Sequence, residues 1–347
     1  MEILIIKLSA IGDVIHTLPS LRALKETFPD ARISWVVETA ASDLLIGNPD
    51  LDRIIISHRK KWAANLRNFR DVKNTFSEVA SFLRDLRDRN FDIVIDFHGL
   101  FKSALLAFLA RGKRKIGYDS MQELSGIFYN EKIPEDMGKH AVDRYLDFPR
   151  YLGFKGDKAE FRIYPGAENE RQVEELLRSH KIEPGDPVIA VSPQALWDTK
   201  LWDNQKFAAL CDRIRGELGM KIVFTGSGAG EMIADITAKM KTAAVNLEGK
   251  TTLRGLAALF RRVSLLVTTD SGPMHLAAAM GTPVVAIFGP TSPARTGPYG
   301  GTHNVIQKID MKCVPCFLKH CETKDCMNSV TVDEVFQAVK MRIKTAF

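Results

Sequence analysis

The sequence has few of the features that mark membrane, secreted or repetitive proteins. No apolar run reaches the roughly 18 residues that a bilayer span requires. The most apolar stretch, 276–289, is short and interrupted by Gly281 and Pro283. Residues 1–7 lack the basic start and the small-residue cleavage site of a signal peptide. Short-period repeats and low-complexity tracts are also absent. We therefore expect a cytoplasmic protein.

Cysteine is scarce, since five residues in a chain of 347 are too few for a disulfide scaffold. Four of them share the spacing C-x2-C-x4-C-x4-C beside His320, at Cys313, Cys316, Cys321 and Cys326. The first pair is compatible with zinc, but the later spacings are not those of a common zinc finger. Zinc, disulfides and free thiols all remain open, and we expect a structural role for this cluster.

The composition is that of a folded protein with an anionic partner. Apolar residues make up 45% and charged residues 26% of the chain, which is typical of globular proteins. A length of 347 residues suits two domains. The net charge of +6 favours a nucleotide, a phosphorylated lipid, a membrane surface or a nucleic acid, without choosing among them.

Short apolar runs alternate with helical patterns, which predicts parallel sheets with crossover helices. The expected strands are 3–6, 33–37, 53–56, 93–95, 115–117, 188–191, 221–225, 265–268 and 284–288. The expected helices are 18–28, 72–89, 103–110, 168–180, 206–218, 231–240, 253–260 and 273–280.

Two domains follow from this pattern, 1–165 and 166–347, with a candidate hinge in the Pro/Gly cluster 183–187. Both halves repeat one doubly wound architecture. Ligands of such sheets bind at the carboxyl ends of the strands, so we expect a cleft between the domains to hold the site.

The first strand leads into a glycine and a carboxylate, Gly12 and Asp13. Gly12 permits a tight turn close to a ligand. A carboxylate at this strand-to-helix junction suits a general base acting on a hydroxyl. It also suits a helix N-cap, which is the simpler interpretation of the residues alone.

In the second half, the strand 265–268 leads into Thr269-Asp270-Ser271-Gly272, and Pro273 opens a helix. The free N–H groups and the positive dipole end of such a helix suit a diphosphate. Asp270 is a candidate for binding sugar or ribose hydroxyls, and His275 lies one turn further. The alternative is an ordinary capped helix with a core-facing histidine.

Two further loops point to a nucleotide. The glycines of 226–230 are typical of a phosphate loop, but Glu231 occupies the place of the third glycine of the dinucleotide fingerprint. No acidic residue that would bind a ribose ends the next strand, which argues against an NAD-dependent oxidoreductase. Lys200, in the loop 197–202, is suited to neutralise a departing diphosphate, although a solvated lysine is the alternative.

Taken together and in this order, these motifs resemble glycosyltransferase family 9, the ADP-heptose:lipopolysaccharide heptosyltransferases. The motifs are 12–14, Lys200-x-Trp202, the loop 226–231, 246–253, 269–275, 288–291 and the Cys-x-x-Cys stretch. Residues 127–130 and 139–144 are closer to the type I enzymes, which add the first heptose to Kdo.

The resemblance implies a GT-B fold with two Rossmann-like domains and inverting transfer from ADP-heptose to a Kdo sugar of Kdo-lipid A, with no metal or other cofactor in the chemistry. The family's base matches Asp13. Its donor contacts match Lys200, Glu231, Asp270, Ser271, Gly272 and His275. The alternative is a heptosyltransferase II-type enzyme or another nucleotide-sugar glycosyltransferase of the same family, because Ala195-Leu196 and the region near Gln122-Glu123 depart from the type I pattern. A non-catalytic nucleotide-sugar or lipid-binding protein is a further alternative.

A basic segment completes the predicted site. Its cations are Arg59, Lys60, Lys61, Arg67 and Arg70, and only Asp71 offsets them in the local sequence. We expect Arg59, Lys60 and Lys61, in a mobile region, to bind the carboxylates and phosphates of Kdo-lipid A at the cytoplasmic face of the inner membrane. A solvated face is the alternative. Aromatic residues do not interleave with these cations, so we do not expect nucleic acid as a partner.

Overall fold

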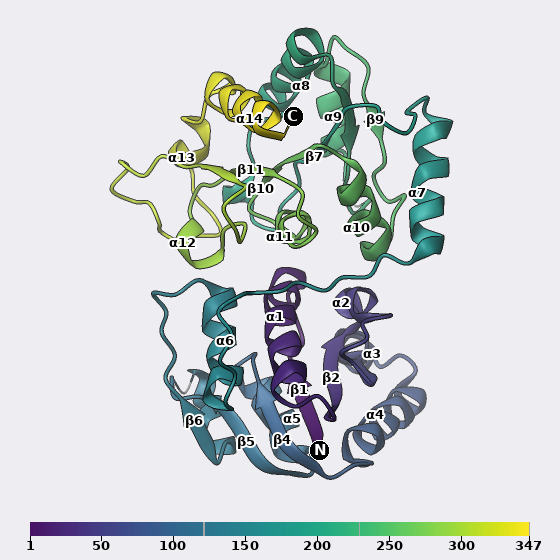
Figure 1. Ribbon diagram of the computed structural model, residues 1–347, viewed down its shortest axis with the longest axis vertical. Helices are drawn as coiled ribbons and strands as arrows, with labels where there is room; N and C mark the ends of the chain where they lie inside the picture. Colours follow the sequence, from purple (N-terminus) through teal and green to yellow (C-terminus); the bar gives the residue numbers. More distant parts are fainter. Residues whose placement is uncertain (121, 229, 347) are drawn as a thin grey trace. The chain divides into compact units, whose positions relative to one another are not determined.

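The computed structural model describes residues 1–120, 122–228 and 230–346 (Figure 1). The chain divides into two compact units, Met1–Tyr164 and Pro165–Phe347. The Pro/Gly cluster 183–187 lies inside the second unit, where the Glu183 N–H donates to Asp186 Oδ2 over 2.7 Å. This cluster is therefore a turn of that unit, and the division precedes it.

The first unit is built on a six-stranded parallel sheet in the order β3-β2-β1-β4-β5-β6. Its strands are β1 (Glu2–Ile6), β2 (Arg32–Glu38), β3 (Arg53–Ser57), β4 (Phe91–Asp96), β5 (Gly112–Tyr118) and β6 (Glu131–Ile133). Its helices are α1 (Ile11–Thr27), α2 (Thr39–Ser42), η1 (Asp43–Leu45), α3 (Arg59–Arg67), α4 (Val72–Arg87), α5 (Phe101–Leu109), η2 (Gln122–Phe128) and α6 (Ala141–Tyr151).

Helices cover both faces of this sheet, as Figure 1 shows. Helix α1 packs against α6, whereas α4 packs against both α3 and α5. Alternate residues of a strand point to opposite faces, and Leu4 and Ile6 join the core formed with α4 and α5. Because both faces are covered, β1 is apolar almost throughout, which is the property that made it recognisable in the sequence.

The second unit repeats this plan in the order β12-β11-β10-β7-β8-β9. Its strands are β7 (Val188–Ser192), β8 (Lys221–Phe224), β9 (Val245–Asn246), β10 (Leu265–Thr269), β11 (Val284–Ile287) and β12 (Asn304–Ile306). Its helices are α7 (Ala167–Ser179), η3 (Asp198–Lys200), α8 (Asn204–Leu218), α9 (Met232–Lys239), α10 (Leu253–Arg262), α11 (Gly272–Ala279), α12 (Pro293–Thr296), α13 (Asp325–Asn328) and α14 (Val332–Ala346). The indole of Trp202, buried in this core, donates to the Val330 carbonyl over 3.1 Å.

Each sheet has one topological switch point, between β1 and β4 in the first unit and between β7 and β10 in the second. There the connections leave toward opposite sides, so the carboxyl ends of the two strands lie open to a ligand. Asp13 follows β1 and His98 follows β4, while Lys200 follows β7 and Asp270 follows β10. Four ionisable side chains thus follow the strands at the two switch points, where ligands of such sheets bind.

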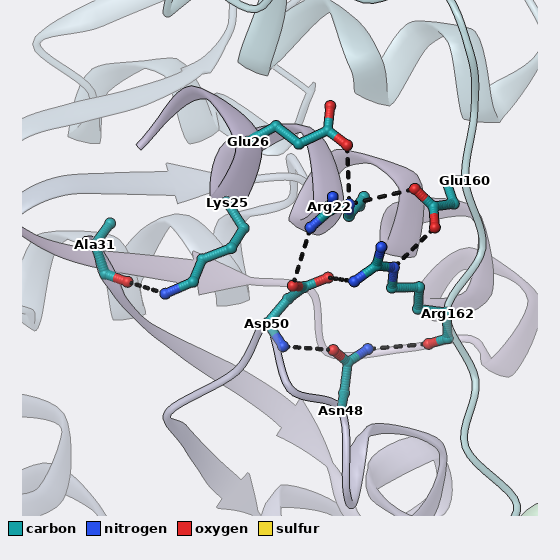
Figure 2. Close-up of polar contacts among 8 residues, drawn as sticks. All are labelled: Arg22, Lys25, Glu26, Ala31, Asn48, Asp50, Glu160 and Arg162. Carbon is teal, nitrogen blue, oxygen red and sulfur yellow. Dashed lines mark hydrogen bonds and ion pairs between the residues drawn. The ribbon is translucent and has the colours of Figure 1, made fainter. Parts of the chain in front are cut away.

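The end of the first unit is held by an ion-pair network, shown in Figure 2. Asp50, which is buried, lies 3.4 Å from Arg22 Nη1 and 3.6 Å from Arg162 Nη1. Asn48 Nδ2 donates to the Arg162 carbonyl over 3.0 Å. The segment 160–162 is therefore fixed to α1 and to the loop after η1, just before the chain enters the second unit.

The structure also corrects several boundaries. The helix expected at 18–28 begins at Ile11 and includes Pro19, and the basic segment expected to be mobile forms helix α3. The strands β6, β9 and β12 and the helices α6 and α14 were not predicted from the sequence. Within the described ranges, no helix has the length and apolar content that a membrane span requires.

Candidate active site

Asp13 lies in the first turn of α1, where one carboxylate oxygen caps the helix. Its Oδ2 accepts a hydrogen bond from the Ala10 N–H over 3.1 Å. This contact satisfies one of the N–H groups that a helix leaves unpaired at its start, and the negative charge complements the helix dipole. The sequence suggested Asp13 as the N-cap residue itself, but Ala10 holds that position, and Asp13 caps the helix from the third position of its first turn.

The other oxygen of Asp13 belongs to a chain of buried donors. Tyr145, on α6, lies with its hydroxyl 3.2 Å from Asp13 Oδ1. Lys7, at the end of β1, donates through Nζ to the Tyr145 hydroxyl over 2.6 Å and to the Phe97 carbonyl over 3.0 Å. A lysine ammonium can only donate, so the phenol accepts from Lys7 and donates its own proton to Asp13. The carboxylate is thereby oriented from two sides.

Burial shifts the pKa values of Lys7 and Tyr145, the two donors that lead to Asp13. Burial lowers the pKa of Lys7, and the negative charges of Asp13 and Asp96 oppose that shift. Burial also raises the pKa of Tyr145 well above its ordinary value, and the charge of Asp13 adds to the effect. Tyr145 is therefore a neutral phenol, which is the form that donates to a carboxylate.

The loop after β4 is organised by the fully buried Asp96. Its Oδ1 accepts from the N–H groups of His98 and Gly99 over 2.8 and 3.2 Å, and its Oδ2 accepts from the Tyr129 hydroxyl over 2.7 Å. Burial lowers the pKa of His98 to about 3, and the charges of Lys7 and Lys102 add to this effect, whereas Asp13 opposes it. His98 therefore adds a neutral imidazole to the switch point.

The predicted acceptor cations separate into two groups. Arg59 donates through Nε and Nη2 to Glu38 Oε1 over 3.1 and 2.9 Å, and Lys60 Nζ lies 3.5 Å from Glu38 Oε2. Lys61 instead pairs with Glu78 over 2.7 Å. The local sequence suggested Asp71 as the only offsetting charge. In the structure, Glu38 and Glu78, which come from other elements, pair with these cations instead.

The Arg59–Lys60 group lies on the side of the first unit that carries the switch point. Glu38 ends β2, the strand beside β1, and the charges of Arg59, Lys60 and Glu38 all act on the pKa of Lys102 at the start of α5. Lys61 lines a different pocket, together with Glu78 and Asp85. Lys61 shares this pocket with two carboxylates, and one of them already pairs with it, so Arg59 and Lys60 are the better candidates for binding an anionic ligand.

In the second unit, Lys200 and Asp270 form a close ion pair. Lys200 Nζ lies 2.6 Å from Asp270 Oδ2 and 4.4 Å from the centre of the Trp197 ring. The same oxygen of Asp270, which is buried, accepts from the Thr291 hydroxyl over 2.6 Å. The sequence suggested both charged residues as ligand contacts but did not indicate that they pair.

Helix α11 begins directly after this pair. Ser271 is its N-cap residue, and Gly272 and Pro273 form its first turn. The structure thus brings Lys200, Asp270, Ser271 and Gly272 together at the carboxyl end of β10. His275 lies one turn into α11 and is buried. The combination of a cation and a helix N-terminus is suited to a phosphate group.

The glycine loop after β8 is shaped by close packing. Gln194 donates through Nε2 to Glu248 over 2.6 Å and accepts from the Ser227 N–H over 3.1 Å. A Cβ atom at position 226 would lie 2.6 Å from Gln194 Oε1, so any side chain there would displace the Gln194 amide. Glu231 follows as the exposed N-cap residue of α9. No contact of its side chain with the Lys200–Asp270 pair is present among the described residues.

The cysteine cluster lies apart from both switch points in the sequence. Burial raises the pKa of Cys326, and Cys313, Cys316 and Cys321 lie near enough to raise it further. All five cysteines of the chain are unpaired thiols. In the part of the chain that the structure describes, no group of three or more His, Cys, Asp or Glu side chains has an arrangement suited to a metal ion.

Several residues of this site were missed in the sequence. They are Lys7, Tyr145, His98, Glu38, Gln194 and Thr291. Lys7 offered a signal, since a lysine that ends an apolar buried strand must find partners inside the fold. Tyr145 gave none, because its partners are more than 100 positions away in the chain.

Comparison with known proteins gives matches over most of the chain. The family model described as glycosyltransferase family 9 (heptosyltransferase) matches residues 79–327. Lipopolysaccharide heptosyltransferase 1 of Pseudomonas aeruginosa is 30% identical over 92% of this chain and 87% of its own length.

Solved structures give the same result. The glycosyltransferase family 9 protein of Veillonella parvula has a TM-score of 0.86 and 26% identity, over 99% of this chain and 97% of its own. The Escherichia coli heptosyltransferase WaaC with ADP has a TM-score of 0.78 and 25% identity, over 99% of this chain and all of its own.

The buried Asp96 generates a prediction about stability and pH. Burial raises the pKa of Asp96 in the folded protein, so between the unfolded value and the raised one the folded state holds the proton more tightly. Asp96 therefore stabilises the fold less as the pH rises through that window. Asp96→Asn removes this dependence while its amide oxygen still accepts from His98 and Gly99. We expect the stability of the variant, relative to the wild type, to increase from about pH 4 to about pH 7.

Urea unfolding at both pH values measures this difference, and Asp92→Asn on the same strand is the control. Hydrogen bonds from the Glu2 N–H and from Lys113 lower the pKa of Asp92. Asp92 therefore stabilises the fold above its unfolded pKa. The stability of Asp92→Asn, relative to the wild type, is expected to decrease from the lower to the higher pH. A relative stability of Asp96→Asn that falls between the two pH values would contradict the assignment.

Proposed function

The chain belongs to glycosyltransferase family 9, and from that premise we propose that it transfers L-glycero-D-manno-heptose from ADP-heptose to a Kdo sugar of Kdo-lipid A. One observation carries this proposal. The similarity to lipopolysaccharide heptosyltransferase 1 of Pseudomonas aeruginosa extends over 92% of this chain, and Asp13 follows the first strand at the switch point of its sheet. The enzyme acts at the cytoplasmic face of the inner membrane, where its acceptor is anchored.

Asp13 is the general base of this reaction. The acceptor hydroxyl oxygen bonds to the anomeric carbon while the bond from that carbon to the ADP oxygen breaks on the opposite side. The hydroxyl proton passes to Asp13, and ADP leaves with the electron pair of the broken bond. Tyr145 and the Ala10 N–H each donate to one carboxylate oxygen, which supports a fixed orientation of this carboxylate.

The second unit holds the donor. Lys200 and the N-terminus of α11, at Ser271 and Gly272, stabilise the negative charge that ADP gains as it leaves. Asp270 holds Lys200 in place and accepts from sugar or ribose hydroxyls, while His275 and Glu231 complete the donor contacts. The chemistry needs no metal ion or other cofactor, because these fixed groups neutralise the diphosphate.

Arg59 and Lys60 bind the anionic acceptor. Both already contact Glu38, so an arriving carboxylate or phosphate shares cations that a buried carboxylate has oriented. Lys61 is less suited to this role because it pairs with Glu78 in a pocket that also holds Asp85. Nucleic acid is not a partner in this proposal.

The proposed reaction is tested by measuring ADP release from ADP-heptose with and without Kdo-lipid A. The proposal expects release only when the acceptor is present. Release with an already heptosylated acceptor and none with Kdo-lipid A would identify a heptosyltransferase II-type enzyme. The absence of release with every acceptor would contradict the proposal.

Asp13→Asn separates catalysis from capping. Asparagine still accepts from the Ala10 N–H, so the helix cap is kept while the base is lost. We expect kcat to fall by about 10² to 10⁴ with an unchanged affinity for ADP-heptose, and the melting temperature to fall less than it does in Asp13→Ala. Asp13→Ala must show the same loss of kcat together with a lower melting temperature. A near-normal kcat for Asp13→Asn would leave Asp13 with a capping role only.

Lys200→Met tests the donor site. We expect kcat/KM to fall by about 10² to 10³, because the cation acts mainly on the charge that develops on ADP. Lys200→Met also leaves Asp270 buried without its partner, so the double variant Lys200→Met/Asp270→Asn is needed. The double variant is expected to recover thermal stability but not kcat/KM.

The control for this experiment is Lys319→Met, whose amine lies 5.4 Å from the centre of the same Trp197 ring. This variant is expected to keep wild-type kcat/KM. Activity is also expected to persist in EDTA, and a loss that Mg²⁺ restores would contradict metal-independent transfer.

Arg59→Ala/Lys60→Ala tests the acceptor site, with Lys61→Ala as the matched single control from the same helix. Each charge-assisted contact that is lost contributes roughly 1.5–3 kcal/mol, so we expect the acceptor KM to rise about tenfold or more. The KM for ADP-heptose is expected to stay nearly constant. The Lys61 variant is expected to change the acceptor KM much less, and equal effects from both variants would contradict the division of the cations.

A further inference from the structure

Helix α5 packs Leu106 and Leu109 against the core but carries three large apolar residues on the outside. Ser103, Ala104 and Ala107 are fully buried, and the helix packs on β4 and β5. Phe101, Leu105 and Phe108 recur at the spacing that places side chains on one face of a helix, and all three are exposed. A helix on a sheet ordinarily turns its large apolar residues inward. The exposed stripe therefore contributes little to the packing of the fold.

The segment η2 extends this stripe. Its residues Leu124 and Ile127 are exposed, and the ring of Phe128 lies 5.7 Å from that of Phe101 and 5.6 Å from that of Phe108. We call the resulting surface the α5–η2 patch, and its members are Phe101, Leu105, Phe108, Leu124 and Ile127. Between 37% and 65% of each of these residues is exposed. Contiguous apolar surface of this kind marks an interaction site.

The backbone of η2 is held in a costly conformation that presents this surface. Glu123 and Leu124 have φ values of 50° and 62°, in the left-handed region that side chains other than glycine rarely adopt. Glu123 Oε2 accepts from the Phe101 N–H over 3.2 Å and so joins η2 to the first turn of α5. The strained turn thus keeps Leu124 outside and fixes it to the helix.

The chain around the patch is strongly basic. Residues 97–118 include five cations and no acidic residue. The cations are Lys102, Arg111, Lys113, Arg114 and Lys115, of which Lys113 pairs with Asp92 and Arg114 with Glu131. Lys102 follows Phe101 in the first turn of α5, and Lys115 Nζ lies 5.3 Å from the centre of the Phe108 ring. Cations therefore flank the apolar stripe at both of its ends.

We propose that the α5–η2 patch docks the protein on the surface of an anionic phospholipid bilayer. The apolar side chains enter the headgroup region, while the flanking cations contact lipid phosphates. The inference rests on the proposed function, in which the acceptor is anchored in a membrane. The patch begins three residues after His98, which adjoins Asp13 at the switch point, so docking brings the base close to the lipid surface.

A second copy of the chain fits this surface less well. A two-fold contact would set the patch against itself, and the cations of one copy would then meet those of the other. An anionic bilayer instead complements both the apolar stripe and the charge that surrounds it.

The test compares vesicle binding of three forms of the full chain. The patch variant is Leu105→Gln/Phe108→Gln/Ile127→Gln, and the matched control is Phe69→Gln/Phe76→Gln, whose phenylalanines are 88% and 63% exposed outside the patch. Cosedimentation uses vesicles of phosphatidylethanolamine with phosphatidylglycerol, and vesicles of neutral phosphatidylcholine. We expect the wild type and the control to bind the anionic vesicles at least about tenfold more tightly than the patch variant does. Binding of the wild type to neutral vesicles is expected to be similarly weak.

Equal binding of anionic vesicles by the patch variant and the wild type would overturn the proposal. So would sedimentation velocity showing that the patch variant has lost a dimer while vesicle binding is unchanged. ADP release with a water-soluble Kdo acceptor distinguishes the two proposals, because the patch variant is expected to keep the wild-type rate. Absence of ADP release in all forms, with vesicle binding lost only in the patch variant, would refute the proposed function and support the docking surface.

Discussion

The hydrogen bonds of the buried Lys7 ammonium are the interactions on which the first unit's site depends. A cation removed from water is costly unless its protons are received by acceptors inside the protein. Lys7 meets this requirement by donating to the end of β4, at the Phe97 carbonyl, and to α6, at the Tyr145 hydroxyl. The same contacts leave Tyr145 with its proton directed at Asp13. One buried charge thereby joins three elements and determines the orientation of the candidate base.

In both units, the charged residues of the candidate site lie at the topological switch point of the sheet. In each unit the first strand is central, the next two extend to one side, and the last three extend to the other. The switch point of the first unit holds a carboxylate oriented by donors, at Asp13. That of the second holds a cation oriented by a carboxylate, Lys200 with Asp270. A base for a hydroxyl and a counter-charge for a diphosphate are the two groups that inverting transfer from a nucleotide sugar requires.

The sequence was sufficient for the architecture because parallel strands buried on both faces form apolar runs that stand out from their surroundings. It also located Asp13, Asp270 and the start of α11, since each lies where such a strand leads into a helix. Contacts between distant segments could not be read in this way. The pairing of Lys200 with Asp270, and of Arg59 with Glu38, depends on which strand ends are adjacent. Strand β6 was not predicted because it is a short edge strand, and two of its three residues are charged.

The role of Asp13 as an oriented base is tested most directly by the pH dependence of kcat/KM in Tyr145→Phe. This variant removes the hydroxyl that donates to Asp13, and a carboxylate that loses a donor to its ionised form becomes a weaker acid. The acidic limb of the pH profile is therefore expected to move to higher pH. Tyr118→Phe is the control, since its buried hydroxyl donates instead to the Arg144 carbonyl over 3.1 Å. An acidic limb that stays in place in Tyr145→Phe, or moves equally in both variants, would contradict Asp13 as the oriented base.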